Sequence, residues 1–138
     1  WSGGGSMTLN ALFRYPDLYH AGISIAPVPD QRLYDTIYQE RYMGLPKDNT
    51  DGYKNGSPIT FAKNLKGKLL LVHGTADDNV HYQGMAKLVD SLVAHGKQFE
   101  MIAYPNRSHS IREGKGTTLH LRTAMTRFLH RHLPAGSR

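Results

Sequence analysis

Residues 69–72 read Leu-Leu-Leu-Val, and this short stretch decides the fold class. It is apolar at every position, which is typical of a strand that is covered on both faces of a sheet. Strand-like runs also occur at residues 22–26 and 99–104, and helical patterns lie between and around the three runs. Strand and helix in alternation indicate a parallel sheet with right-handed crossovers, so we predict an α/β fold with flanking helices.

The helical patterns are clearest in the second half of the chain. Apolar residues at 85, 88, 89, 92 and 93 share one helix face, and Gly96 follows where a left-handed C-cap would sit. A second stripe runs from Leu121 to Leu129 and is ended by Pro134. Residues 43–60 and 105–117 carry turn-forming residues, and we expect two long loops that serve a site or a partner surface.

Composition excludes several classes of protein. The chain has 138 residues, 39% of them hydrophobic, and no cysteine, so it is one domain at most, without disulfides, thiolate zinc sites or a cysteine nucleophile. No apolar run approaches the ~20 residues that span a bilayer. The histidines do not form an H-E-x-x-H motif, and we expect neither a metal site nor a cofactor.

The net charge of +6 is concentrated at one end of the chain. From Arg107 to Arg138 there are seven basic residues and one acid, and residues 1–106 sum to zero. Positive charge near the C-terminal end of a helix is favoured by the helix dipole. Because no RNA-binding or zinc-finger signature accompanies it, we predict a solvated basic helix and no nucleic-acid partner.

The start of the chain, Ser2-Gly3-Gly4-Gly5 followed by a helix-compatible segment at residues 7–13, is compatible with a nucleophile elbow. In such a turn the serine Oγ stands exposed above the sheet, and the next backbone N–H, here that of Gly3, points at the developing oxyanion. The full motif also needs a glycine two positions before the serine, and the sequence starts one residue too late to include it. A glycine-rich linker or a phosphate-binding turn remains an alternative for this segment.

Two downstream residues favour the elbow. Asp77 follows the all-apolar run, and His109 follows the next strand, which gives the chain order Ser, Asp, His of α/β-hydrolases. A hydroxyl, an imidazole that takes its proton and a carboxylate that orients the imidazole are the three groups that acyl transfer requires. Taken singly, His109 could be a polar surface residue, and Asp77 with Asp78 could cap a helix that starts near Tyr82.

Three blocks of sequence carry a resemblance to a known family: residues 1–5, 34–46 and 73–81, joined by the loop around His109. Essentially end to end, the chain resembles the C-terminal part of the catalytic domain in the dipeptidyl peptidase IV group, bacterial type, of the prolyl oligopeptidase family of serine peptidases. The resemblance implies an α/β-hydrolase fold. It also implies that Ser2 is the nucleophile, Asp77 rather than Asp78 the triad carboxylate, and His109 the general base.

The same resemblance implies a substrate pocket. Its residues receive the penultimate proline of a peptide substrate on aromatic and aliphatic walls and hold a substrate carbonyl with an amide. They are Tyr34, Tyr38, Val28, Val80 and, for the carbonyl, Asn79. Gln31 stands where relatives usually have a tryptophan, so we expect a wider or more polar pocket and a relaxed preference for proline.

The resemblance further implies that residues 1–138 are a fragment of a peptidase catalytic domain that begins at the elbow. On this reading, the upstream strands, a second oxyanion donor and a β-propeller lie outside it, and the sheet is incomplete, with about three strands. The expected partners are a peptide substrate, the missing N-terminal part of the same polypeptide and a second copy in a homodimer. Relatives are periplasmic, secreted or membrane-anchored.

We therefore predict a serine exopeptidase that releases N-terminal dipeptides and prefers Pro or Ala at the penultimate position. An esterase or acylaminoacyl-peptidase-like hydrolase with the same triad is one alternative, because Gln31 changes the pocket wall. The other alternative is that the isolated chain is a catalytically silent structural fragment, since loss of one oxyanion donor costs about 10²–10³ in rate.

Overall fold

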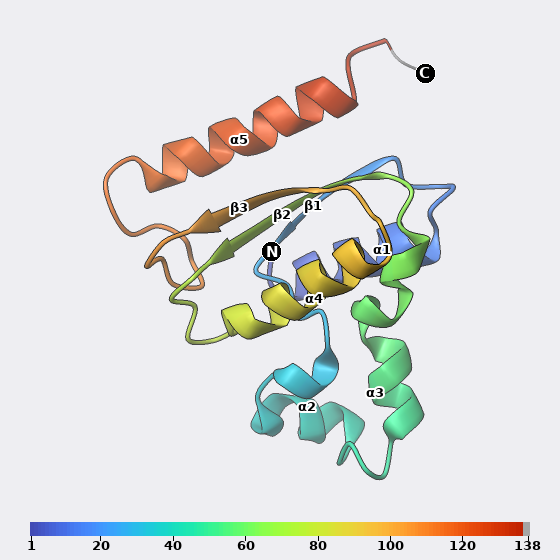
Figure 1. Cartoon of the computed structure of the whole chain (residues 1–138). Coiled ribbons are helices and arrows are strands. Elements are labelled where there is room, and N and C mark those ends of the chain that lie inside the picture. Colours follow the sequence, from blue (N-terminus) through green and yellow to red (C-terminus); the bar gives the residue numbers. More distant parts are fainter. Residues whose placement is uncertain (137–138) are drawn as a thin grey trace.

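The structure is a computed structural model that describes residues 1–136, and it contains a three-stranded parallel sheet with helices on both faces (Figure 1). The strands are β1 (Ala21–Ile25), β2 (Lys68–Gly74) and β3 (Glu100–Tyr104), in the order β1-β2-β3. The helices are α1 (Gly3–Arg14), α2 (Thr36–Met43), α3 (Thr50–Gly56), α4 (Tyr82–Ala94) and α5 (Thr117–His132), with 3₁₀ turns η1 (Gln31–Leu33) and η2 (Pro58–Asn64). The predicted α/β fold is confirmed.

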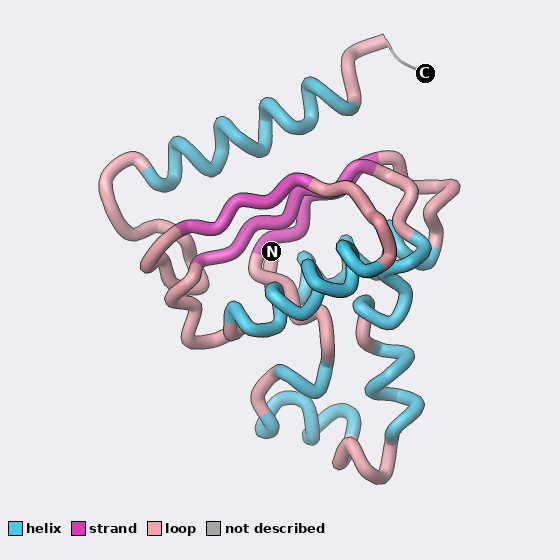
Figure 2. Tube along the Cα trace, in the orientation of Figure 1, coloured by secondary structure: helices cyan, strands magenta, loops and turns pink. Residues whose placement is uncertain are grey.

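The all-apolar stretch forms the central strand because both of its faces are covered. Leu69 and Leu71 pack on one side of the sheet, while Leu70 and Val72 pack on the other. Pairing is parallel on both edges of β2, with Leu70 opposite Ile23 of β1 and Val72 opposite Ile102 of β3. Figure 2 shows the three strands as one layer between the helices.

Two apolar cores result from this arrangement. On one face, α1, α4 and η2 cover the sheet, and their buried residues are Leu9, Leu12, Phe13, Ala62, Leu65, Met85, Leu88 and Leu92. On the other face lies α5, whose Leu121 and Phe128 pack with Ile25, Tyr104 and Ile111. Of the helical stripes expected at residues 85–93 and 121–129, the structure buries Met85, Leu88, Leu92, Leu121 and Phe128, whereas Val93 and Leu129 at the stripe ends are exposed. Gly96 has the left-handed φ of 64° expected after α4.

Residues 43–60 are not the long loop that their composition predicts. They include the end of α2, all of α3 and the start of η2. The side chain of Asn49 accepts the N–H of Gly52 at 3.1 Å and so caps α3, and the buried Tyr53 donates its hydroxyl to the carbonyl of Gly44 at 2.7 Å. The turn-forming residues here act as helix caps. We call residues 31–56 the helical lobe; its α2 and α3 lie away from the sheet in Figure 1.

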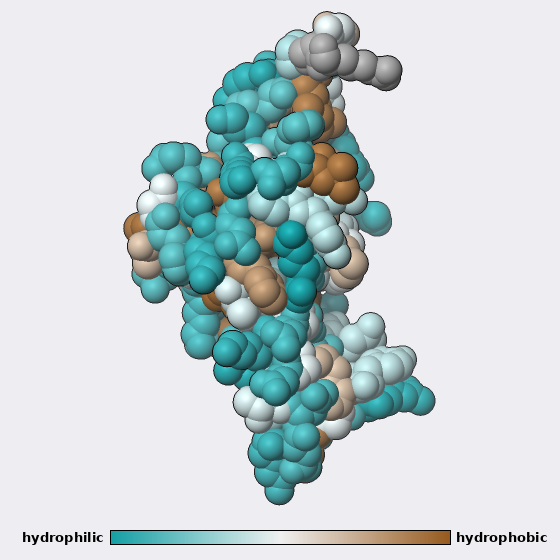
Figure 3. Space-filling model, turned by 90° about the vertical axis from the view of Figure 1, so that its right-hand side faces the viewer, coloured by the Kyte–Doolittle hydropathy of each residue, from teal (hydrophilic) through white to brown (hydrophobic). Residues whose placement is uncertain are grey.

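The surface is mainly polar on the face seen in Figure 3, with a small apolar strip in the upper part, where α5 ends. Leu129 and Leu133 are exposed in that part of the chain. Basic residues of α5 face solvent, and Arg131 forms an exposed ion pair with Glu100 of β3 at 3.2 Å. Within residues 1–136, no helix combines the length and the apolar character needed to cross a membrane.

Candidate active site

Ser2 lies in a sharp turn that leads directly into α1. Its φ of 53° and ψ of −121° are rare for a residue with a side chain, and such a conformation costs about 1–3 kcal/mol. Two hydrogen bonds hold the turn: the Ser2 N–H donates to the Ile25 carbonyl at 2.8 Å, and the Ser2 carbonyl accepts the Ser6 N–H at 3.0 Å. A strained serine at a helix start is typical of a nucleophile elbow.

The glycines after Ser2 have different roles. A Cβ on Gly5 would lie 2.7 Å from the carbonyl oxygen of Ile25, so close packing of α1 on β1 requires a glycine there. Gly3 and Gly4 have nothing within 4 Å of a Cβ, so a side chain would find space at these two positions. As the first residue of α1, Gly3 has an N–H without an intrahelical acceptor at the positive end of the helix dipole.

Asp77 follows the carboxyl end of β2, and its side chain is completely buried. Its Oδ1 accepts the backbone N–H groups of Asn79 at 3.0 Å and Val80 at 2.9 Å. Its Oδ2 lies 2.8 Å from Nδ1 of His109 and 3.2 Å from Nε2 of His73. The carboxylate is thus fixed from four sides, and it does not cap α4, whose N-cap is His81.

His109 stands in the loop at residues 105–116, after the carboxyl end of β3. Its ring Nδ1 bonds Asp77, which fixes the ring, and its side chain is 23% exposed, so the opposite edge of the ring is accessible. Asp77 and His109 therefore meet as the triad hypothesis requires, although 32 residues separate them in sequence.

Packing against β2 holds the His109 loop in place. The Ala76 N–H donates to the Arg107 carbonyl at 3.1 Å, and a Cβ on Gly74 would clash with that same carbonyl. The Arg107 guanidinium then ties the loop together by donating to the carbonyls of Pro105 at 2.7 Å and Glu113 at 3.1 Å. The approach of His109 to β2 depends on these contacts.

The carboxylate of Glu113 holds the residue before His109. It accepts the hydroxyl of Ser108 in a short hydrogen bond and the Ser108 N–H at 3.3 Å. These contacts, led by the bond from the Ser108 hydroxyl, lower the pKa of Glu113 from 4.5 to about 2. Glu113 is therefore ionised, and its bonds to Ser108 are intact, throughout the neutral range.

His73 is a member of the site that sequence reasoning missed. It is fully buried near the end of β2, and its Nε2 lies 2.8 Å from the Val80 carbonyl. Since a carbonyl only accepts, this nitrogen carries the proton, and the buried Nδ1 has no hydrogen-bond partner within residues 1–136. Burial is the main cause that lowers the pKa of His73, so its imidazole is neutral.

Ser2 is connected to His109 through Trp1. The Trp1 Nε1 donates to the His109 carbonyl at 3.0 Å, which brings the residue before the serine against the His109 loop. No hydrogen bond joins Ser2 Oγ to the His109 ring in the part of the chain that the structure describes. Two members of the predicted triad are thus bonded, and the third is adjacent through its neighbour.

A cavity of about 500 Å³ adjoins Ser2, a size within the usual range of small-molecule sites. Its lining residues come from the start of the chain, from the segment after β1 and from the helical lobe: Ser2, Gly3, Ser6, Met7, Asn10, Val28, Gln31, Tyr34, Tyr38, Gln39 and Gly56. The rings of Tyr34 and Tyr38 meet edge to face with centroids 5.5 Å apart. Five of the predicted site residues therefore line this one cavity: Ser2, Gly3, Val28, Tyr34 and Tyr38.

The remaining two pocket residues lie beside this cavity. Asn79 accepts the Tyr34 hydroxyl on its Oδ1 at 2.9 Å, which ties the helical lobe to the loop that carries Asp77. Val80 is buried and contributes its carbonyl to His73. Neither residue is among those that line the cavity beside Ser2.

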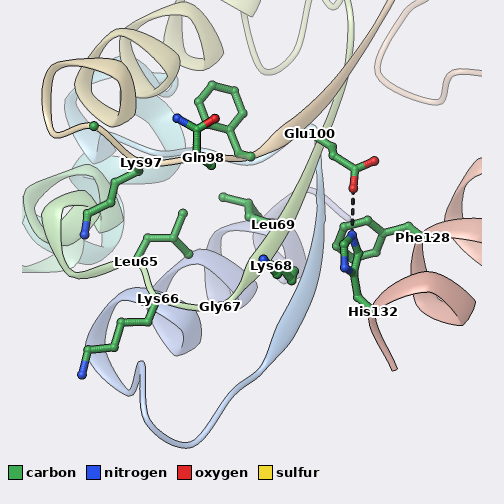
Figure 4. Close-up of a pocket in the computed structure, with 12 residues that line it drawn as sticks. Leu65, Lys66, Gly67, Lys68, Leu69, Lys97, Gln98, Glu100, Phe128 and His132 are labelled. Carbon is green, nitrogen blue, oxygen red and sulfur yellow. Dashed lines mark hydrogen bonds and ion pairs between the residues drawn. The ribbon is translucent and has the colours of Figure 1, made fainter. Parts of the chain in front are cut away.

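A second cavity, of about 370 Å³, lies at the amino ends of β2 and β3 (Figure 4). Three lysines, Lys66, Lys68 and Lys97, contribute to its lining, and Glu100 accepts a hydrogen bond from His132 at 2.8 Å. Because the predicted triad lies beyond the carboxyl ends of the strands, this cavity is at the opposite edge of the sheet. It contains none of the predicted site residues.

Comparisons with known proteins identify the family of the chain. The sequence profile of the prolyl oligopeptidase family matches residues 1–136. Dipeptidyl peptidase 4 of Felis catus is 42% identical over 132 residues, and prolyl endopeptidase FAP of Mus musculus is 41% identical over the same length; each match covers 94% of this chain and 17% of the relative.

A solved structure of a dipeptidyl peptidase 4 is also similar to this chain. The crystal structure of Porphyromonas gingivalis dipeptidyl peptidase 4 superimposes with a TM-score of 0.94 at 44% identity, over 96% of this chain and 19% of that chain. The likeness confirms the α/β-hydrolase fold of the chain. With the profile match and these levels of identity, the chain belongs to the prolyl oligopeptidase family of serine peptidases.

Proposed function

We propose that the full-length protein containing this chain is a dipeptidyl peptidase that releases N-terminal dipeptides with Pro or Ala at the penultimate position. The observation that carries the proposal is the 2.8 Å bond between Asp77 and His109, next to a strained serine turn and an aromatic cavity. The names of the relatives, dipeptidyl peptidase 4 above all, support the same reaction.

The chemistry follows from the protonation of His109. With Nδ1–H donating to Asp77 Oδ2, Nε2 is left as the base that takes the Ser2 proton. The Ser2 Oγ forms a bond to the carbonyl carbon of the penultimate residue, and the carbonyl oxygen takes the negative charge that the Gly3 N–H stabilises. The imidazolium then protonates the leaving amine as the C–N bond breaks, and water repeats the steps to release the dipeptide.

The pocket residues have complementary roles in this proposal. Tyr34, Tyr38 and Val28 line the cavity, and their aromatic and aliphatic surfaces suit a flat, rigid proline ring that has no N–H to satisfy. Because Asn79 Oδ1 already accepts the Tyr34 hydroxyl, its Nδ2 remains as a donor for a substrate carbonyl.

The nucleophile is tested by covalent labelling of the full-length protein. We expect a fluorophosphonate probe to label the wild type and a Ser91→Ala control in α4, and to leave Ser2→Ala unlabelled. We expect Asp77→Asn to lower kcat by about 10⁴-fold, because the histidine loses the group that holds its tautomer. Continued labelling of Ser2→Ala contradicts the proposed nucleophile.

Substrate preference is tested separately. We expect Ala-Pro and Ala-Ala amides to release dipeptide, with the proline substrate turned over faster. Equal turnover of the two removes the proline preference. A p-nitrophenyl ester cleaved far faster than either amide favours the esterase alternative, for which the polar Gln31 in the cavity wall is the supporting observation.

A further inference from the structure

The wall of the cavity beside Ser2 contains two glutamines that bond each other. Gln31 donates its Nε2 to the Gly56 carbonyl at 3.2 Å and its backbone N–H to the Ser57 hydroxyl at 2.8 Å. Gln39 of α2 donates its Nε2 to Gln31 Oε1 in a short hydrogen bond. The pair therefore holds two side chains of the helical lobe in one arrangement against the cavity.

The orientation of both amides follows from the carbonyl of Gly56. A carbonyl only accepts, so the Gln31 amide nitrogen must face it, and Gln31 Oε1 must face Gln39. Gln39 then has to present its own nitrogen to Gln31, and that nitrogen also lies 3.6 Å from the Met43 sulfur, a weak acceptor. These contacts use the amide nitrogen of Gln39 and leave its amide oxygen, Oε1, free to accept a hydrogen bond.

Gln39 Oε1 has no hydrogen-bond donor within residues 1–136, although the residue is only 5% exposed. Within this range, His73 Nδ1 is the one fully buried side-chain nitrogen or oxygen without a partner. Gln39 Oε1 therefore keeps some contact with solvent. Gln39 lines the cavity that Ser2 lines. The cavity thus offers an unused acceptor to a bound molecule.

The other walls limit what that molecule can be. The rings of Tyr34 and Tyr38 suit a flat ring, while Gln39 Oε1 needs a donor. Binding an entirely apolar side chain would take water from this acceptor without replacing the hydrogen bond, which is costly. A ring or small side chain that carries a hydroxyl satisfies both walls.

We infer that Gln39, oriented by Gln31, is a specificity-determining residue that selects substrates with a hydroxylated penultimate residue, such as 4-hydroxyproline in place of proline. The inference rests on the proposed function, since it assigns the cavity to the penultimate residue. The hydroxyl donates to Gln39 Oε1, and the ring lies against the two tyrosines.

The experiment compares two substrates that differ by one hydroxyl. The coumarin amides of Ala-Pro and Ala-4-hydroxyproline are assayed with the full-length protein, and the ratio of their kcat/KM values is measured. We expect the hydroxylated substrate to be preferred by the wild type. In Gln39→Met, which keeps the size of the side chain and removes the acceptor, we expect the ratio to fall about tenfold. Gln98→Met, at an exposed position beside the second cavity and outside the cavity that Ser2 lines, is the matched control and keeps the wild-type ratio.

Each other outcome has a defined meaning. A Gln39→Met ratio equal to that of the wild type, or a wild type that prefers Ala-Pro, overturns the inference while dipeptide release still supports the proposed function. A wild type that releases neither dipeptide overturns both. If Gln39→Met fails to react with the fluorophosphonate probe, Gln39→Leu applies the same ratio test to a labelled, folded variant.

Discussion

The indole Nε1 of Trp1 donates a hydrogen bond to the backbone carbonyl of His109 at 3.0 Å, although 108 residues separate them. Through this bond, the residue before the strained serine also contacts the loop that carries the His109 imidazole, the general base in the proposed function. The guanidinium of Arg122, in α5, lies over the Trp1 ring, 6.0 Å from its centre. Trp1 therefore joins the serine turn, the His109 loop and α5.

Substitution of Trp1 tests this connection. In the full-length protein we expect Trp1→Phe to lower kcat/KM about fivefold, because a single partly exposed hydrogen bond contributes about 1 kcal/mol. The loss should fall on kcat more than on KM, since the cavity is untouched. Arg122→Met removes the cation and keeps the hydrogen bond, and kcat/KM should stay near the wild-type value. Equal losses in both variants contradict the role of the indole N–H.

Gly4 and Gly5 offer a test of the packing of α1 on β1. We expect Gly5→Ala to lower the melting temperature, because its Cβ would lie 2.7 Å from the Ile25 carbonyl and force the helix off the sheet. Gly4→Ala has nothing within 4 Å of its Cβ and should be neutral or stabilising by up to about 1 kcal/mol, as expected for alanine in a helix. The melting temperature should therefore fall in Gly5→Ala and stay the same or rise in Gly4→Ala.

The buried His73 predicts a pH dependence of stability. Burial lowers its pKa below 6.5 in the folded protein, so the unfolded chain binds the proton first as the pH falls. The free energy of unfolding contributed by this group is present above pH 6.5 and decreases below it, by at most about 1.4 kcal/mol per pH unit. We expect His73→Gln to flatten this part of the melting-temperature profile.

The control for His73 is His95→Gln. His95 is exposed at the end of α4, and its replacement should leave the slope below pH 6.5 unchanged. A His73→Gln protein with the slope of the wild type shows that another group produces the acid sensitivity.

Glu113 should affect the stability of the protein at lower pH than His73 does. Its pKa is lowered from 4.5 to about 2, chiefly by the Ser108 hydroxyl, so its stabilising effect is complete above 4.5 and is lost as the pH falls towards 2. We expect Glu113→Gln to melt below the wild type at pH 6 and the difference to close between pH 4.5 and 2. Asp90→Asn, at an exposed position in α4, should show no such convergence.

The fold could be predicted because its signals are local. The apolar run at 69–72 is buried on both faces of the sheet. In the stripes at 85–93 and 121–129, buried residues recur with the helix period over several turns. The loop predicted at residues 43–60 was wrong because the helix there has no local signal of this kind. A helix as short as α3 shows no period, and its start depends on one side-chain oxygen, that of Asn49, whose residue type is equally common in loops.

The site was less accessible to sequence reasoning. The order of Ser2, Asp77 and His109 suggests a triad, yet the bond from Trp1 and the contact of His73 with the Val80 carbonyl depend on packing that no local pattern encodes. A signal for His73 did exist, since it is a polar residue at the end of an apolar strand and stands four positions before Asp77.

The helical lobe has a consequence for how this scaffold can be altered. The tyrosine and glutamine walls belong to residues 31–56, whereas the carboxylate and the imidazole belong to loops after β2 and β3, and the Tyr34–Asn79 bond ties the lobe to the loop after β2. The proposed function therefore assigns substrate selection mainly to the helical lobe, and the acid and base of bond cleavage to loops that lie elsewhere in the sequence. Libraries randomised at positions 31 and 39 should diversify substrate range while sparing the reaction machinery.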